Sequence, residues 1–264
     1  MIGFIGGGNM AEALIKGMTS IHIKDIYVSE PQKDRRHYIE KTYGVKTTGD
    51  NIELGRAADI IIVAVKPQII SGIAEALNSM DLSKKTLVSI AAGVSTSYLR
   101  QAFRTDNVIR VMPNTPALVL KGMSVIAAGE GCSADTMGRI VEIFSSIGKI
   151  HFLSERHMDA VTALSGSGPA FIALFVEGMI QGGIALGLNE ETASLLTLQT
   201  LAGTAELLAS HTPEAVIKMV SSPGGTTVAG LKAFNDRDVM GVIAGAICAA
   251  ASRSAELNIK TTGT

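Results

Sequence analysis

The most informative segment for the fold is Ile2-Gly3-Phe4-Ile5-Gly6-Gly7-Gly8-Asn9-Met10-Ala11. Residues 2–5 form an apolar run that predicts a short buried strand, and the pattern G-x-G-x-x-A follows at once. Gly6 permits a tight turn, Gly8 lets a pyrophosphate approach the backbone, and Ala11 keeps the next helix close to the sheet. The amides at the start of that helix then hold the phosphates. The segment predicts a dinucleotide site, with a purely structural glycine turn as the alternative.

Further along the chain, short apolar runs alternate with amphipathic stretches. The runs are rich in Ile and Val and are bounded by turn residues, as buried strands are. They span residues 2–5, 26–28, 60–65, 86–91, 108–111, 123–128 and 149–153. Between the last two, a helix is expected with Ser133 as its N-cap and Gly148 at its C′ position. The alternation predicts an α/β fold whose parallel sheet is covered on both faces, a Rossmann-type dinucleotide-binding domain over residues 1–153.

After residue 153 the strand-like runs stop and long helical stretches follow. They span residues 168–188, 190–210, 213–220, 226–235 and 238–257. Asn189 before two glutamates, and Thr212 before Pro213, mark two of the helix starts. We therefore expect an all-helical domain over residues 154–264. Its helices are rich in glycine, which costs roughly 0.5–1 kcal/mol per residue relative to alanine, so they need tight packing. A compact bundle is one solution, and packing against a second subunit is favoured because the core is thin.

Composition excludes several functional classes. The chain has 264 residues, of which 47% are hydrophobic and 18% charged, so disorder is excluded as the main state. With 23 Lys and Arg against 24 Asp and Glu, and no Trp, we expect no nucleic-acid partner. Cys132 and Cys248 form no disulfide framework, and the histidines show no zinc pattern, so we expect no metal. The apolar runs fall short of the ~20 residues of a membrane helix, and no secretory signal is visible. We therefore expect a cytoplasmic protein with no membrane segment.

Three more segments are expected at the ligand-binding edge of the sheet. Glu30 follows the second apolar run. An acid at this position accepts a hydrogen bond from the ribose 2′-hydroxyl of NAD and repels the extra phosphate of NADP. Basic residues follow it, and these either pair with that phosphate or form a solvated helix face: Lys33, Arg35 and Arg36. The cofactor is therefore expected to be NAD or NADP. Two later runs end in Ala64, Val65, Lys66 and Pro67, and in Ala91, Ala92 and Gly93, which suit either a cofactor or a tight turn.

The segment Ser221-Ser222-Pro223-Gly224-Gly225-Thr226-Thr227 combines hydroxyls, glycine amides and a helix start. Such a combination suits a small carboxylate, with a plain capped turn as the alternative. The sequence shows no Ser-His-acid or Cys-His signature and no P-loop. Without an evident protein general base, the pattern favours hydride transfer from a nicotinamide to a substrate that is already electrophilic, such as an imine.

Taken together, these motifs resemble the pyrroline-5-carboxylate reductase family. The resemblance covers nearly the whole chain. It rests on residues 4–10, 64–67, 91–94, 112–116 and 164–170, and above all on 220–227. It implies reduction of the cyclic imine 1-pyrroline-5-carboxylate to L-proline with NAD(P)H, the final step of proline biosynthesis.

The resemblance also implies roles for individual residues. The turn made by Gly6, Gly7, Gly8, Asn9, Met10 and Ala11 binds the pyrophosphate. Asn51 contacts the adenosine side, and residues 64–67 and 91–93 line the nicotinamide half. Ser222, Gly225 and Thr226 form the pocket for the substrate carboxylate, Glu155 lies near the substrate, and Thr227 is the catalytic residue that faces the ring nitrogen.

At the level of assembly, the resemblance implies a helical domain that builds an intertwined homodimer. Dimers of this family often assemble into decamers, as pentamers of dimers. The active site is expected between the nucleotide domain of one subunit and the helical domain of its partner.

Two residues depart from the family pattern, and two other hypotheses compete with it. Glu30 stands where NADPH-using members often carry Ser, and Met219 stands where some carry Asn, so the choice between NADPH and NADH stays open. A β-hydroxyacid dehydrogenase would place a lysine and an asparagine where Phe171 and Phe175 stand. A non-catalytic NAD-sensing module would not need a carboxylate pocket at residues 222–227.

Overall fold

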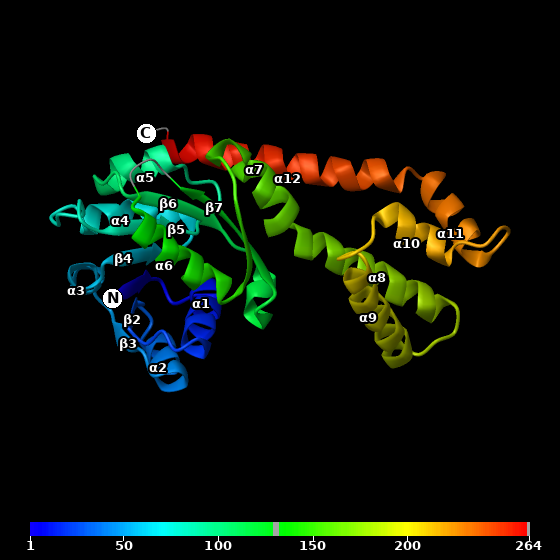
Figure 1. The fold of residues 1–264 in the computed structure, drawn as a ribbon, viewed down its shortest axis with the longest axis horizontal. Coiled ribbons are helices and arrows are strands. Elements are labelled where there is room, and N and C mark those ends of the chain that lie inside the picture. The colour runs from blue at the N-terminus through cyan, green and yellow to red at the C-terminus, as the bar shows by residue number, and fades with distance from the viewer. Residues whose placement is uncertain (129–131, 263–264) are drawn as a thin grey trace. The chain divides into compact units, whose positions relative to one another are not determined.

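The computed structural model describes residues 1–128 and 132–262. The chain divides into two compact units, shown in Figure 1. The first unit consists of residues 1–167 together with the chain from residue 249 onward, and the second consists of residues 168–248. The boundary predicted after residue 153 precedes the second unit, because residues 154–167 pack with the first. Met158 and Val161, for example, are buried against Val125 and Ala127.

Within the described residues, the first unit is built on an eight-stranded sheet of order β3-β2-β1-β4-β5-β6-β7-β8. The strands are β1 (Ile2–Ile5), β2 (Ile26–Ser29), β3 (Lys46–Thr48), β4 (Ile60–Val63), β5 (Thr86–Ser89), β6 (Val108–Met112), β7 (Gly122–Ala128) and β8 (Gly148–Phe152). The six strands from β3 to β6 in this order run parallel. The direction in which successive strands are added reverses at β1, which lies between β2 and β4. This is the arrangement that places ligands at the carboxyl ends of the central strands.

The expected wholly parallel sheet is wrong at one edge. Strand β7 is antiparallel to β6, and β8 is parallel to β7. Only the short helix η2 (Thr115–Val119) lies between β6 and β7, whereas a parallel crossover needs a dozen or more residues. The predicted strands are otherwise confirmed in position. Strand β3 was not predicted, because Lys46–Thr48 is a short polar segment at the sheet edge with no apolar run.

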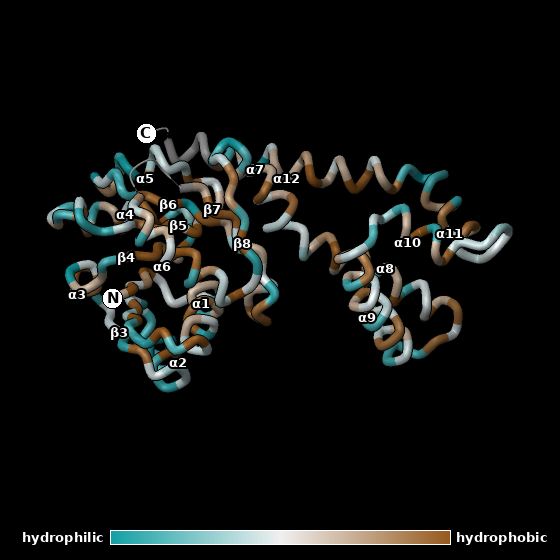
Figure 2. The backbone as a smooth tube through the Cα atoms, viewed as in Figure 1, coloured by the Kyte–Doolittle hydropathy of each residue, from teal (hydrophilic) through white to brown (hydrophobic). Residues whose placement is uncertain are grey.

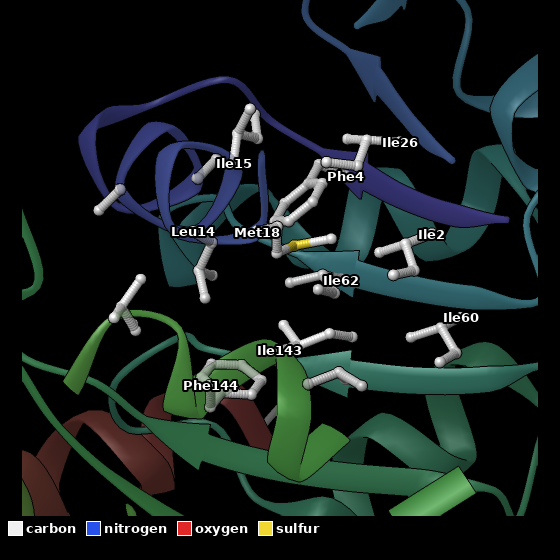
Figure 3. Packing of buried hydrophobic residues seen from close by; sticks show 14 of the residues in the cluster. Ile2, Phe4, Leu14, Ile15, Met18, Ile26, Ile60, Ile62, Ile143 and Phe144 are labelled. Atoms are coloured by element: carbon white, nitrogen blue, oxygen red, sulfur yellow. The ribbon is translucent and has the colours of Figure 1, made fainter. Parts of the chain in front are cut away.

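Helices cover both faces of the sheet. The larger helices of the first unit are α1 (Asn9–Ser20), α2 (Lys33–Tyr43), α3 (Asn51–Ala57), α4 (Ile70–Ala76), α5 (Thr96–Phe103) and α6 (Ala134–Ser145). Figure 3 shows Leu14 and Met18 of α1 and Phe144 of α6 packed beside Phe4 and Ile62 of the sheet. The opposite face buries apolar residues of α3, α4 and α5. Each face therefore has its own apolar core, as predicted.

The helix α6 begins as predicted but ends differently. Ser133 is its N-cap, and the Ser133 hydroxyl accepts a hydrogen bond from the Thr136 amide at 3.2 Å. Its C-cap is Ser146, so Gly148 does not occupy the C′ position. Instead Gly148 opens β8 with φ +147°, and a Cβ there would collide with the backbone of Gly122. The glycine is required by close strand pairing and not by the helix end.

The second unit is helical, as expected. It contains α8 (Gly168–Ala185), α9 (Glu190–Leu207), α10 (Pro213–Val220), α11 (Thr226–Asn235) and the first part of α12 (Val239–Thr262). The predicted caps of α9 and α10 are confirmed: the Asn189 side chain accepts from the Thr192 amide at 2.8 Å, and the Thr212 hydroxyl accepts from the Ala215 amide at 3.3 Å.

This unit buries almost none of its own apolar side chains. Over residues 168–248, all of which the structure describes, Ala193 and Thr197 are the only buried residues. Large apolar side chains stand exposed, with Leu186 at 88% and Met240 at 80% of full exposure. Figure 2 shows apolar segments recurring along α8 and α12. Such a unit lacks a core of its own and has apolar surface that another molecule has to cover.

Two helical stretches, Glu155–Ala185 and Val239–Leu257, are long and apolar enough to cross a membrane by length and composition alone. The sequence expectation concerned unbroken apolar runs, which differ from the mean hydropathy of a helix. Glycine and serine inside a helix interrupt such runs without lowering the mean hydropathy of the helix much.

Candidate active site

The glycine turn between β1 and α1 has the geometry that its motif predicts. Gly6 has φ +97°, and a Cβ on it would lie 2.7 Å from the carbonyl oxygen of Ala64, so the turn requires glycine there. Gly8 is the N-cap of α1 with an extended backbone, and a Cβ on it would meet nothing within 4 Å. No side chain caps the amides of the first turn of α1. The turn therefore offers free backbone donors beside open space, which is the requirement of a phosphate site.

Glu30, at the end of β2, is tied to this glycine turn. Its Oε2 accepts a hydrogen bond from the amide of Gly7 at 2.9 Å, and its Oε1 accepts from the amide of Gln32 at 3.0 Å. The carboxylate thus stands where an NAD-binding acid is expected, next to the helix start that would hold the pyrophosphate.

The basic residues after Glu30 are largely engaged elsewhere. Arg35 donates to the carbonyl of Gly7 at 2.6 Å and forms an ion pair with Glu12 of α1. Arg36 donates to the backbone carbonyls of Glu30 and Pro31 at 2.6 and 2.9 Å. These guanidinium groups hold the loop in shape, so they are less available to a 2′-phosphate than the sequence suggested.

Three further predicted cofactor segments lie at the same edge of the sheet. Asn51 begins α3, and its Oδ1 accepts from the Ser29 hydroxyl at the end of β2 at 2.7 Å. Residues 64–67 follow β4 and border the glycine turn, because the Gly6 Cα faces the backbone of Ala64 and the side chain of Val65. Residues 91–93 follow β5, the next strand, and Gly93 turns the chain with φ +67°. The first unit therefore brings all of the predicted cofactor residues to one edge.

The segment before α11 forms a second helix start of the same kind. Gly224 has φ +70°, and the Gly225 amide donates to the carbonyl of Ser222 at 2.9 Å. Gly225 is the N-cap of α11, and no side chain caps the amides that follow it. A Cβ on Gly225 would collide with the Ser222 hydroxyl as it is placed, so a larger residue would have to displace that hydroxyl. Thr226 and Thr227 are the first two residues of the helix, so hydroxyls and backbone amides gather at a helix start, a combination that suits a small anion.

Glu155 lies in the first unit, apart in the chain from residues 222–227 of the second. It begins the short helix η3 (Glu155–His157), and its carboxylate is already bound on both oxygens. Oε1 accepts from the backbone amide of Thr96 at 2.7 Å and lies 3.3 Å from Nη1 of Arg110, while Oε2 accepts from the Thr96 hydroxyl. Sequence reasoning missed Arg110 and Thr96. The available signal was a lone arginine inside the apolar run of β6.

Metal-ligating side chains do not gather in the part of the chain that the structure describes: no group of three or more His, Cys, Asp or Glu residues there could hold a metal ion. The chemistry that the two helix starts support is anion binding, by backbone amides and hydroxyls.

Comparisons with known proteins match one family model to the N-terminal part of the chain and another to the C-terminal part. Residues 1–93 match the family model described as NADP oxidoreductase, coenzyme F420-dependent, and residues 155–257 match that for pyrroline-5-carboxylate reductase dimerisation. The chain is 39% identical to a pyrroline-5-carboxylate reductase of Synechocystis, with 98% of each chain covered. It is 36% identical to that of Pisum sativum, covering 97% of this chain and 96% of the relative.

Solved structures give the same result. The fold is similar to that of a Plasmodium falciparum pyrroline carboxylate reductase with NADP bound, with a TM-score of 0.88, 32% identity and 97% of each chain covered. The corresponding comparison with a pyrroline-5-carboxylate reductase from Coxiella burnetii gives a TM-score of 0.89 and 33% identity, again over 97% of each chain.

Proposed function

Because this chain belongs to the pyrroline-5-carboxylate reductase family, we propose that two of its helix starts, each with a glycine N-cap, divide the ligands between them. The chain is an NAD(P)-dependent oxidoreductase that converts 1-pyrroline-5-carboxylate to L-proline. In the proposal, the start of α1 holds the cofactor pyrophosphate and the start of α11 holds the substrate carboxylate. The observation that carries the proposal is shared by both helices: a glycine N-cap that leaves first-turn amides without a side-chain partner.

The cofactor is assigned to the nucleotide-binding domain, residues 1–153. The amides of Asn9, Met10 and Ala11 bind the pyrophosphate beside Gly8, where the open space fits it. Glu30 and Asn51 bind the adenosine ribose. The segments that follow β4 and β5 line the nicotinamide, which supplies the hydride when the cofactor is bound.

The substrate is assigned to the helical domain, residues 154–264. The Ser222 hydroxyl and the Thr226 amide, beside the Gly225 N-cap, fix its carboxylate, which sets the orientation of the ring. The Thr227 hydroxyl faces the ring nitrogen. Reduction of the C=N bond adds a hydride to carbon and a proton to nitrogen, so a hydroxyl at this nitrogen either positions it or passes a proton to it.

The helical domain is also assigned to subunit contact, as the dimerisation model matched over residues 155–257 supports. The exposed apolar side chains of α8 and α12 then become interface residues of a homodimer, and we propose that dimers assemble further into decamers. The two long apolar helices are assigned to this interface and not to a membrane. We place the protein in the cytoplasm, with no nucleic-acid or membrane partner.

The test is oxidation of NADH or NADPH by the purified protein in the presence of 1-pyrroline-5-carboxylate, with L-proline measured as the product. We expect proline to form in equal amount to the cofactor oxidised. A hydroxy acid with NAD⁺ serves as the control substrate and should give no turnover. A protein that binds the cofactor but forms no proline would overturn the proposal.

A further inference from the structure

Arg110 is an arginine buried inside the sheet. It lies in the middle of β6, is 2% exposed, and pairs in register with Ser89 of β5, which is also buried. Its Nη1 faces the Glu155 carboxylate, while its Nη2 is buried with no hydrogen-bond partner among the described residues. A guanidinium in such surroundings is costly unless a carboxylate compensates its charge. Glu155 is the acid that the described structure pairs with it.

The same carboxylate holds the beginning of α5. Thr96 is the first residue of that helix, so its backbone amide has no intrahelical acceptor. Glu155 accepts from this amide at 2.7 Å and also from the Thr96 hydroxyl. Two groups of Thr96 are thereby fixed to a residue that lies far away in the sequence.

Thr96 in turn limits where the nicotinamide loop lies. Six residues, 90–95, join the last residue of β5 to Thr96. The β5 end is held by the sheet, and the Ala91 amide donates to the Ser89 hydroxyl at 3.3 Å. Gly93 adopts φ +67°, and Val94 is fully buried. A short loop anchored at both ends has few alternative conformations, so a shift of Thr96 would displace Ala92 and Gly93.

We propose that Arg110 and Glu155 form a charged clamp on Thr96 that positions the Ala91-Ala92-Gly93 loop against the nicotinamide. Glu155 is then a positioning residue for the cofactor and not a ligand of the substrate, and Arg110 keeps its carboxylate oriented. The inference rests on the proposed function, because it takes residues 91–93 as the nicotinamide-lining segment. It gives Glu155 a different role from the substrate contact that family resemblance implies.

Charge supports this role. The substrate itself carries a carboxylate, so a free carboxylate of Glu155 beside it would repel it. In the clamp, the negative charge of Glu155 is balanced by Arg110, and its oxygens are directed toward Thr96.

The test compares Glu155→Gln with Thr96→Val, which keeps the shape of Thr96 and its amide but removes the hydroxyl. Both variants should weaken binding of NADPH alone, measured by fluorescence titration, and both should lower kcat. The KM for 1-pyrroline-5-carboxylate should change less than about threefold in either variant, since neither side chain touches the substrate. The losses of the two single variants should not add in the double variant, because both changes act on the contact between Glu155 and Thr96.

If Glu155→Gln does not fold, Arg110→Met combined with Glu155→Met removes the whole pair without leaving a buried charge, and this variant should fold and show the same loss of cofactor affinity. The clamp would be overturned if Glu155→Gln raised the KM for substrate strongly while NADPH affinity and the Thr96→Val variant stayed at wild-type values. Failure of the proposed function is a separate outcome, since wild-type protein would then form no proline although the titration of NADPH distinguished the variants.

Discussion

The carboxylate of Glu30 accepts a hydrogen bond from the backbone amide of Gly7, with 2.9 Å between Oε2 and the nitrogen. This contact joins the end of β2 to the glycine turn, so the residue to which we assign ribose recognition also shapes the turn assigned to the pyrophosphate. Arg35 reinforces the contact by donating to the Gly7 carbonyl. In the proposed site, cofactor preference and the geometry of the turn are therefore coupled.

We expect Glu30→Ser to raise the ratio of kcat/KM for NADPH to that for NADH. A carboxylate repels a 2′-phosphate, and its removal leaves the exposed Lys33 as the cation nearest in sequence. Glu30→Gln is the matched control, because it removes the charge and keeps an acceptor for the Gly7 amide. The shift should shrink at high salt. An unchanged ratio in both variants would show that Glu30 does not face the 2′ position. We expect the wild-type enzyme to accept both cofactors.

Gly8→Val should abolish cofactor binding and leave the folded state nearly as stable as before. The backbone at Gly8 is extended and a Cβ there meets nothing, so the branched side chain enters only the space assigned to the pyrophosphate. Cofactor titration and thermal unfolding measure the two effects separately. Normal titration by a folded variant would contradict the placement of the phosphates.

Gly6→Ala is the contrasting change in the same turn. Its positive φ and the 2.7 Å approach to the Ala64 carbonyl mean that the fold itself should suffer, by roughly 1–3 kcal/mol in the free energy of unfolding. Equal stability of the Gly6 and Gly8 variants would contradict the distinct roles given to these glycines.

Thr227→Ala should lower kcat more than it lowers NAD(P)H affinity. A neutral hydrogen bond contributes about 0.5–1.5 kcal/mol, which corresponds to a loss of roughly two- to tenfold, and more if the bond strengthens in the transition state. Steady-state kinetics and cofactor titration separate the two quantities. Thr227→Ser, which keeps the hydroxyl, should recover most of the rate. Weakened cofactor binding with unchanged kcat would remove Thr227 from the substrate site.

The contact between α1 and α2 should contribute less to the free energy of unfolding in acid. Burial raises the pKa of Glu12, but hydrogen bonds from Tyr43, Arg35 and Tyr38 outweigh burial, so the pKa is lowered from its ordinary 4.5. A lowered folded-state pKa means that the stabilisation is present above the unfolded pKa and is lost as pH falls through the folded one. Glu12→Gln should therefore flatten the fall in unfolding free energy below about pH 4.5 in denaturant titrations. Wild-type and variant curves of the same slope would contradict this.

Val242→Asp should prevent assembly. Val242 is 67% exposed on α12 in the single chain, so a charge there is tolerated by the chain itself but would be buried unpaired in the proposed apolar interface. Light scattering after size exclusion should show a smaller species for Val242→Asp, and the wild-type mass for Ser210→Asp, a matched charge at an exposed polar residue. Wild-type mass for both variants would place the interface elsewhere.

Features set by neighbours in sequence could be predicted, and features set by distant contacts could not. The glycine turn, the strands of the central sheet and the caps Ser133, Asn189 and Thr212 each depend on a few consecutive residues. The reversed strand β7 depends on the length of a connection, and the polar edge strand β3 depends on its partner β2. The clamp joins residues 59 positions apart, so no local pattern reveals it. Gly148 shows a further limit of local patterns. A glycine soon after a helix suggested a C′ position, but the structure requires this glycine for close pairing with Gly122 in the sheet.

The nearly coreless second unit ties the stability of this chain to the amount of protein present. With Ala193 and Thr197 as its buried residues, the unit of residues 168–248 would gain most of its apolar burial in the proposed homodimer. Folding of this unit would then be a bimolecular event, and mass action would make its melting temperature rise with concentration. Dilution alone would unfold it before the nucleotide-binding half, whose two cores lie within one chain.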